Sequence, residues 1–141
     1  MANAYYNEFK DKIGNPSGTL GTTSGTSVRL LDDDIKVALI DTGTYTFSAA
    51  HEFYSSVSGV VGTPQLLASK TLVNGVFDAA DVTFTAVSGA TVEAYIIYKD
   101  TGTAGTSPLI AYFDSASSGL PLTPNGGNVT LSFNASGIFA L

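Results

Sequence analysis

The chain carries few side chains that could take part in chemistry. It has one histidine, His51, and no cysteine or tryptophan in 141 residues, of which 13% are charged. A hydrolytic nucleophile needs a base beside it, so a serine–histidine arrangement would have to use His51. A zinc site built on histidine and cysteine needs more of these ligands than the chain contains. No nucleophile elbow, phosphate loop or dinucleotide fingerprint occurs either. We therefore expect His51 to be a partly exposed structural residue and the protein not to be an enzyme.

Carboxylates are the second group that could do chemistry. Asp32, Asp33 and Asp34 form one run, and Asp78 and Asp81 lie close together in a second acidic loop. Oxygen-rich loops can bind Ca²⁺, but the spacing of an EF-hand is absent. Aspartate also bonds its own backbone two residues on, which stabilises turns. Turn and cap chemistry is the favoured interpretation, calcium binding is the alternative, and we expect no cofactor.

The overall charge restricts the partners. The formal net charge is −6 at neutral pH, which opposes binding to nucleic-acid backbones and to anionic membranes. No run of about 18 apolar residues occurs, so we expect no transmembrane helix. The first ten residues lack the basic and apolar regions of a secretory signal. We expect no nucleic-acid or membrane partner, and an acidic balance favours partners with basic surfaces.

The elements that must position these residues begin with one helical stretch, residues 2–13. Asn3 can cap it, and Gly14 and Pro16 end it. Spacings of three and four put four apolar side chains on one face: Tyr5, Tyr6, Phe9 and Ile13. A helix this short is marginal alone, so we expect its aromatic face to dock on its own domain or on a neighbouring subunit.

Glycine, threonine and serine dominate residues 17–27, with a single leucine. Such a segment cannot bury enough apolar surface to offset the entropy of ordering it, which predicts a flexible tether. We therefore divide the chain into residues 1–27, a helix and tether that resemble an arm, and residues 28–141, one globular domain.

Short β-type runs fill the globular part. They are separated by turn residues, and Asn74-Gly75 is a strong signal for a type I′ hairpin. Residues 94–98 are apolar on both faces, which is typical of a central strand. Roughly eight strands about ten residues apart predict an all-β fold, a β-sandwich or jelly-roll-like domain with a short N-terminal helix or arm. The predicted strands are residues 35–40, 44–47, 65–73, 76–77, 82–87, 91–99, 109–113, 129–133 and 138–141. Residues 49–56 are ambiguous, and one helical turn is plausible there.

Several of these segments resemble a family of small virion proteins of tailed bacteriophages. The resemblance rests on strands and turns and covers most of the chain apart from residues 17–27. It is carried by Met1-Ala-Asn-Ala-Tyr-Tyr, Ile35-Lys-Val-Ala-Leu-Ile-Asp, Gly75-Val-Phe-Asp-Ala-Ala-Asp-Val-Thr-Phe-Thr-Ala-Val-Ser-Gly, Val92-Glu-Ala-Tyr-Ile-Ile-Tyr-Lys-Asp-Thr-Gly, Pro108-Leu-Ile-Ala-Tyr-Phe-Asp and Gly119-Leu-Pro-Leu-Thr-Pro-Asn-Gly-Gly.

The resemblance implies a capsid decoration, or cement, protein on the virion surface, made in the host cytoplasm. Its partner would be the major capsid protein, and we expect a homo-oligomer, with a trimer favoured. A tail or neck component is one alternative, and a receptor- or glycan-binding module is another, because a fold does not fix a function. Large aromatic side chains anchor many interfaces, so the predicted contact residues are Tyr5, Tyr6, Phe9 and Tyr54.

Overall fold

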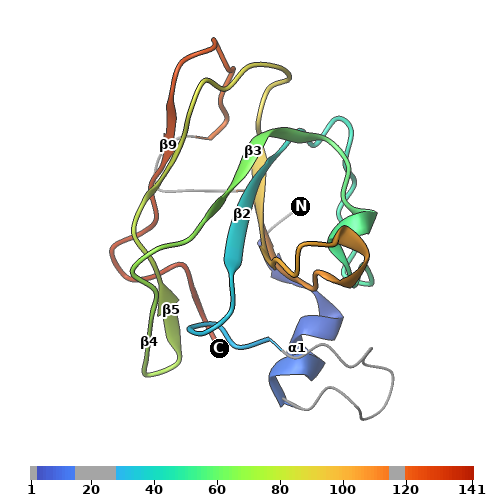
Figure 1. Cartoon of the computed structure of the whole chain (residues 1–141), viewed down its shortest axis with the longest axis vertical. Helices are drawn as coiled ribbons and strands as arrows, with labels where there is room; N and C mark the ends of the chain where they lie inside the picture. The colour runs from blue at the N-terminus through green and yellow to red at the C-terminus, as the bar shows by residue number, and fades with distance from the viewer. Residues whose placement is uncertain (1–2, 15–27, 115–119) are drawn as a thin grey trace.

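The structure is a computed structural model that describes residues 3–14, 28–114 and 120–141. It is an all-β fold with a short N-terminal helix, as the sequence predicts (Figure 1). The predicted tether, residues 17–27, lies outside the described residues. The helical elements are α1 (Asn7–Gly14) and two 3₁₀ turns, η1 (Tyr54–Ser56) and η2 (Ala104–Thr106).

A five-stranded antiparallel sheet forms the centre of the described fold. Its strand order is β1-β8-β7-β2-β3, so β8, β7 and β2 lie in the interior and β1 and β3 at the edges. Nearly every residue of β7, β2 and β8 is buried, which confirms that residues 94–98 form a central strand with two covered faces. The bounds are β1 (Ala4–Tyr5), β8 (Leu109–Phe113), β7 (Ala94–Lys99), β2 (Ile35–Ile40) and β3 (Val60–Leu66).

Two smaller sheets cover one face of the large sheet. One has the order β10-β5-β4 and the other pairs β6 with β9, and Figure 1 shows β4, β5 and β9 along the same side of β2. The arrangement resembles a sandwich with an interrupted second layer. The bounds are β10 (Phe139–Ala140), β5 (Val76–Asp78), β4 (Thr71–Val73), β6 (Val82–Phe84) and β9 (Val129–Leu131).

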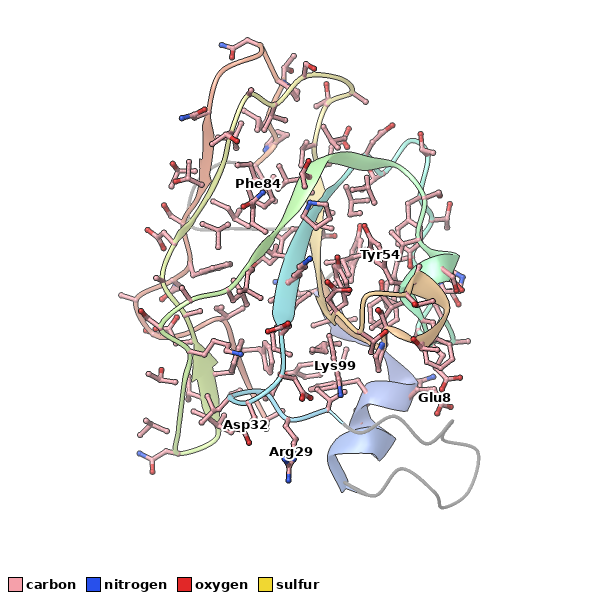
Figure 2. All side chains as sticks on the ribbon, viewed as in Figure 1. Glu8, Arg29, Asp32, Tyr54, Phe84 and Lys99 are labelled. Carbon is pink, nitrogen blue, oxygen red and sulfur yellow. The ribbon has the colours of Figure 1, made fainter. Side chains whose placement is uncertain are left out.

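The other face of the large sheet is covered by loops. Tyr54 of η1 stacks on Tyr98 of β7 with ring centroids 4.1 Å apart, and Phe47 lies 4.8 Å from Tyr112 of β8. Figure 2 shows Tyr54 and Phe84 on opposite sides of the central strands. Buried residues from both sides belong to one hydrophobic core.

The Asn74-Gly75 hairpin forms as predicted. Both residues have positive φ, 51° and 79°, which is the requirement of a type I′ turn. Val73 and Val76 pair directly on either side of it. The hairpin therefore places β4 at the outer edge of its sheet.

Several predicted strand bounds are wrong. The first strand of the predicted run 65–73 already begins at Val60, and the predicted strand 82–87 ends at Phe84, before Ala86 at a φ of 51°. The strands predicted over 91–99 and 129–133 are limited to Ala94–Lys99 and Val129–Leu131. Residues 44–47 form no strand, because the backbone turns there and the Tyr45 amide donates to the Asp41 carbonyl at 3.0 Å. Residues 65–73 divide into the end of β3 and all of β4, with Ser69 between them at a φ of 53°. Pro64 lies inside β3, and an edge strand tolerates it. The ambiguous residues 49–56 do contain a helical turn, η1.

The N-terminal helix begins later than predicted, at Asn7. Ala4 and Tyr5 instead pair with β8 as strand β1. Asn3 does not cap the helix, since its side-chain oxygen accepts from the Asp114 amide at 2.9 Å. Spacings of three and four predicted one helix over residues 2–13. Pairing with the edge of β8 instead gives the backbone N–H and C=O groups of Ala4 and Tyr5 hydrogen-bond partners, so these residues form a strand.

The segment of residues 3–10 is part of the domain core. Tyr6 is 0% exposed and Phe9 is 1% exposed. The ring centroid of Tyr5 lies 5.4 Å from that of Phe139, on the face covered by the small sheets. The ring centroid of Tyr6 lies 5.2 Å from that of Phe47, on the face covered by loops. Side chains of this segment therefore pack on both faces of the large sheet at its edge. In this structure the segment is part of the domain and not a separate arm.

Candidate functional site

His51 lies in the loop before η1, half-buried. Its Nδ1 atom is 2.8 Å from the Tyr45 hydroxyl, and the two rings lie 5.6 Å apart. Tyr45 is in turn bonded to Tyr6. The structure thus gives His51 a structural hydrogen-bond partner in the core.

Two aspartates of the acidic run before β2, Asp32 and Asp33, are paired with nearby groups of the chain. Asp33 accepts from the Arg29 amide at 2.7 Å and lies 3.1 Å from the Lys99 ammonium. Lys70 donates to the Asp33 carbonyl. The exposed Asp32 lies 4.0 Å from Arg29, and Figure 2 shows this pair at the lower end of the molecule.

The second acidic loop has turn and cap partners. Asp78 accepts from the Ala79 amide at 2.9 Å, and Asp81 accepts from the Phe133 amide at 3.0 Å. Within residues 3–14, 28–114 and 120–141, no group of three histidine, cysteine or acidic side chains is arranged to hold a metal ion. In the same part of the chain, no helix is long and apolar enough to cross a membrane.

One carboxylate near this run has a perturbed titration. The pKa of Asp100 is lowered, first by the hydrogen bond from Lys36 at 2.7 Å and then by the Gly102 amide at 2.9 Å. A depressed pKa means that the folded state binds the proton less well than the unfolded state does. The interaction therefore stabilises the fold at pH values above the unfolded pKa of aspartate, about 3.9, and this stabilisation is lost as pH falls through the folded pKa of Asp100.

We expect Lys36→Met to raise the pKa of Asp100 toward its ordinary value, because the variant removes the closest donor and charge. Carboxyl-carbon NMR titration measures the pKa directly. Lys10→Met, which removes an exposed charge on α1, is the matched control and should leave the Asp100 titration unmoved. An unchanged Asp100 titration in Lys36→Met would contradict the pairing.

The structure separates the four predicted contact residues. Tyr6 and Phe9 are buried in the core of their own domain, the first of the two docking sites expected for this aromatic face, so neither is exposed for contact with a partner in this structure. Tyr54 is half-buried against Tyr98. Tyr5 remains half-exposed, and its hydroxyl donates to the Ala140 carbonyl of β10. Tyr5 also lines a surface groove.

That groove has a volume of about 220 Å³ and lies between two strand edges. β1 is the last strand of the large sheet, and β10 is the last strand of its small sheet. Aromatic rings form much of the groove, with Tyr5 and Phe139 edge to face. It is lined by Asn3, Ala4, Tyr5, Phe113, Phe139 and Ala140. The groove therefore combines apolar rings with the outer edges of two described strands.

An apolar patch continues from the groove onto the outer face of β10, β5 and β4. Ala140 pairs with Val76, and Val76 pairs with Val73. Residues paired directly across strands share a face, so the three side chains form one row. Val73 is 62% exposed, and residues 71–77 carry no charge. We call the groove and this row together the hairpin surface.

A second hollow, of about 250 Å³, lies beside the first residues of β3. It is lined mainly by turn residues, including Gly59, Gly62 and Gly89. Its carboxylate, Asp41, is already used within the chain, since it accepts from the Gly43 amide and the Thr44 hydroxyl at 2.8 Å each. The Asp41 side chain therefore stabilises the turn at residues 41–44, and we assign this hollow no binding role.

Sequence reasoning missed the hairpin surface, although part of its signal was present. Asn74-Gly75 predicted the turn, and Val73 and Val76 flank it symmetrically. The missing information was that, in the described part of the chain, no strand pairs with the outer side of β4, and that β10 lies beside β5. Both are long-range facts that local pattern does not contain.

Comparison with protein-family models finds no match, and no curated protein matches the chain. The function must therefore be argued from the chain's own residues.

Proposed function

We propose that this chain is a structural virion protein of a tailed bacteriophage, and that it decorates the capsid by binding the lattice of major capsid proteins. The resemblance of its strand and turn segments to small phage virion proteins suggests this role. The all-β fold supports it, and so does the network of internal partners around the histidine and the acidic loops. On this proposal the protein works through its surface, on the outside of the capsid, as a homo-oligomer, with a trimer favoured.

The observation that carries the proposal is the hairpin surface. An acidic chain with a net charge of −6 leaves an uncharged, apolar strand edge exposed at β4. Exposed edges invite pairing with another chain, and proteins usually protect them with charges or proline. Leu72 and Val73 have neither beside them on that strand. The shortness of β4, three residues, limits pairing at this edge. An apolar edge without charge or proline still fits a protein that is covered when it is in place.

Decoration would stabilise the capsid by mass action. A protein that binds the assembled lattice better than dissociated subunits raises the resistance of the shell to heat. Each copy needs only a modest contact, about 1,200–2,000 Å² in total for a standard specific interface. The protein would stabilise the capsid because many copies bind to it, without catalysing a reaction.

Copy number in purified particles tests the proposal. A decoration protein occurs in a fixed and substantial ratio to the major capsid protein, measured by quantitative gel densitometry or mass spectrometry. A handful of copies per particle would instead indicate a neck, tail or receptor-binding component. Complete absence from particles would overturn the virion assignment.

A further inference from the structure

The chain contains two Asn-Gly pairs, Asn74-Gly75 and Asn125-Gly126. In such a pair the backbone nitrogen of the glycine can attack the side-chain carbonyl carbon of the asparagine, because glycine has no side chain to obstruct the approach. A bond forms between this nitrogen and Cγ, and the bond from Cγ to the side-chain nitrogen breaks. The side-chain amino group leaves with the glycine amide proton as ammonia, and a cyclic imide, a succinimide, remains.

Water then opens the succinimide. Attack of water at the former side-chain carbonyl gives aspartate. Attack at the backbone carbonyl gives isoaspartate, in which the chain runs through Cγ and the backbone carboxyl group is free. The balance is one water consumed and one ammonia released, with no oxidant or reductant. Both products carry a negative charge that asparagine lacks, and both Asn74 and Asn125 are exposed to the water that the reaction needs.

The first pair, Asn74-Gly75, has no hydrogen bond at either reacting group. Asn74 lies at the tip of the β4–β5 hairpin, at the lower end of the view in Figure 1. Among residues 3–14, 28–114 and 120–141, none bonds to the Asn74 side chain or accepts from the Gly75 amide. The Leu141 amide donates to the Gly75 carbonyl at 2.8 Å, which does not involve the Gly75 nitrogen. The nucleophile and the carbon that it attacks are therefore both available.

Attack requires the Asn74 backbone to rotate out of the type I′ turn, so the hairpin must open locally. β4 has three residues, all exposed, and no strand in the described part of the chain pairs with its outer side. Short elements with exposed hydrogen bonds open at low free energy. Opening of this hairpin therefore brings the Gly75 nitrogen to Asn74 Cγ without unfolding the core.

The second pair, Asn125-Gly126, is held in place by its neighbours. The attacking nitrogen of Gly126 donates to the Val87 carbonyl at 2.7 Å. The Asn125 side-chain oxygen accepts from the Gly127 amide at 2.9 Å. The Val87 amide donates to the Gly127 carbonyl at 3.0 Å. Attack at this pair must break the bond to Val87 and turn the Asn125 side chain away from Gly127, so the fold slows the reaction here.

We infer that Asn74 is a site of spontaneous deamidation, and that the fold directs this reaction to Asn74 and away from Asn125. The product places a negative charge within residues 71–77, which carry none, beside the exposed side chain of Val73. Burying a charge without a partner costs more than burying a neutral amide. Deamidation would therefore weaken a contact that buries the hairpin surface. The reaction itself does not depend on the proposed function, whereas the weaker capsid contact does.

Peptide mapping by mass spectrometry, with the folded full-length protein stored at neutral and at mildly alkaline pH, follows both pairs separately. We expect Asn74 to deamidate at least about fivefold faster than Asn125, since one further hydrogen bond to break slows a step by about this factor. The rate should rise with pH, because the glycine nitrogen attacks as its conjugate base, and isoaspartate should be among the products. In concentrated urea the protecting bonds are lost, so both pairs should react at similar rates.

Asn74→Gln and Asn125→Gln are matched variants, because glutamine would have to close a larger ring and reacts far more slowly. Asn74→Gln should remove most of the acidic form that accumulates on ion-exchange chromatography, and Asn125→Gln should leave it. Stable Asn74 in the folded protein, or the same ratio of the two rates in folded and urea-unfolded protein, would overturn the inference. Equal binding of fresh and deamidated protein to particles would overturn only its consequence for the capsid contact.

Discussion

Phe9→Ala is expected to lower the free energy of unfolding by about 3–5 kcal/mol, the usual cost of removing a buried phenylalanine ring. Phe9 is 1% exposed, and its ring centroid lies 6.2 Å from that of Phe139 and 5.9 Å from that of Tyr5. Folded domains have only about 5–15 kcal/mol of stability in total. The variant should therefore show a much lower urea midpoint and a lower melting temperature.

Lys10→Ala is the control for this experiment. Lys10 lies on the same helix, one residue along the chain, with an exposed side chain. Surface changes of this kind usually fall within about 0.5 kcal/mol. If Phe9→Ala were as stable as Lys10→Ala, the N-terminal segment would be an undocked arm in solution and the observed packing would be wrong.

Changing the hairpin surface is expected to have the largest effect on capsid binding. Val73→Gln combined with Ala140→Gln puts two amide groups in the apolar row while leaving the net charge unchanged. Burying an amide without a partner costs about 1–3 kcal/mol on the protein mutational scale, so we expect affinity for the shell to fall at least about tenfold. Binding is measured by cosedimentation with particles that lack the protein.

Thr85→Gln combined with Ala90→Gln is the matched control. Both residues are exposed and lie in or near the β6–β7 connection, which Figure 1 shows at the opposite end of the molecule from the β4–β5 hairpin. Both double variants should unfold at similar urea concentrations, because their side chains are at the surface. Equal losses of binding, or none in either variant, would remove the hairpin surface from the account.

The fold class could be predicted because its signals are local. Alternation around Val82 and Phe84, the doubly apolar run 94–98 and the Asn74-Gly75 turn are each contained in a few neighbouring residues. The N-terminal segment could not be predicted in the same way. Tyr5 and Tyr6 fit a helical spacing, but pairing of β1 with β8, more than 100 residues away, directs them to opposite faces of the sheet.

The candidate site was predicted even less well, for a related reason. Aromatic residues are the usual interface anchors, and the same property makes them good core residues. Burial decides between the two roles, and it depends on what the rest of the chain places over them. Phe47 covers Tyr6, and Phe139 covers Phe9. The exposed apolar residues include aliphatic ones at a strand edge, such as Val73, which a search for aromatic anchors passes over.

Capsid decoration is tested by adding the purified protein to particles that lack it and following the temperature at which the particles release DNA. Decoration predicts saturable binding in a fixed ratio to the major capsid protein, and a release temperature that rises with occupancy. Absence of binding, or binding of a few copies with an unchanged release temperature, would contradict the claim that this chain stabilises a capsid lattice.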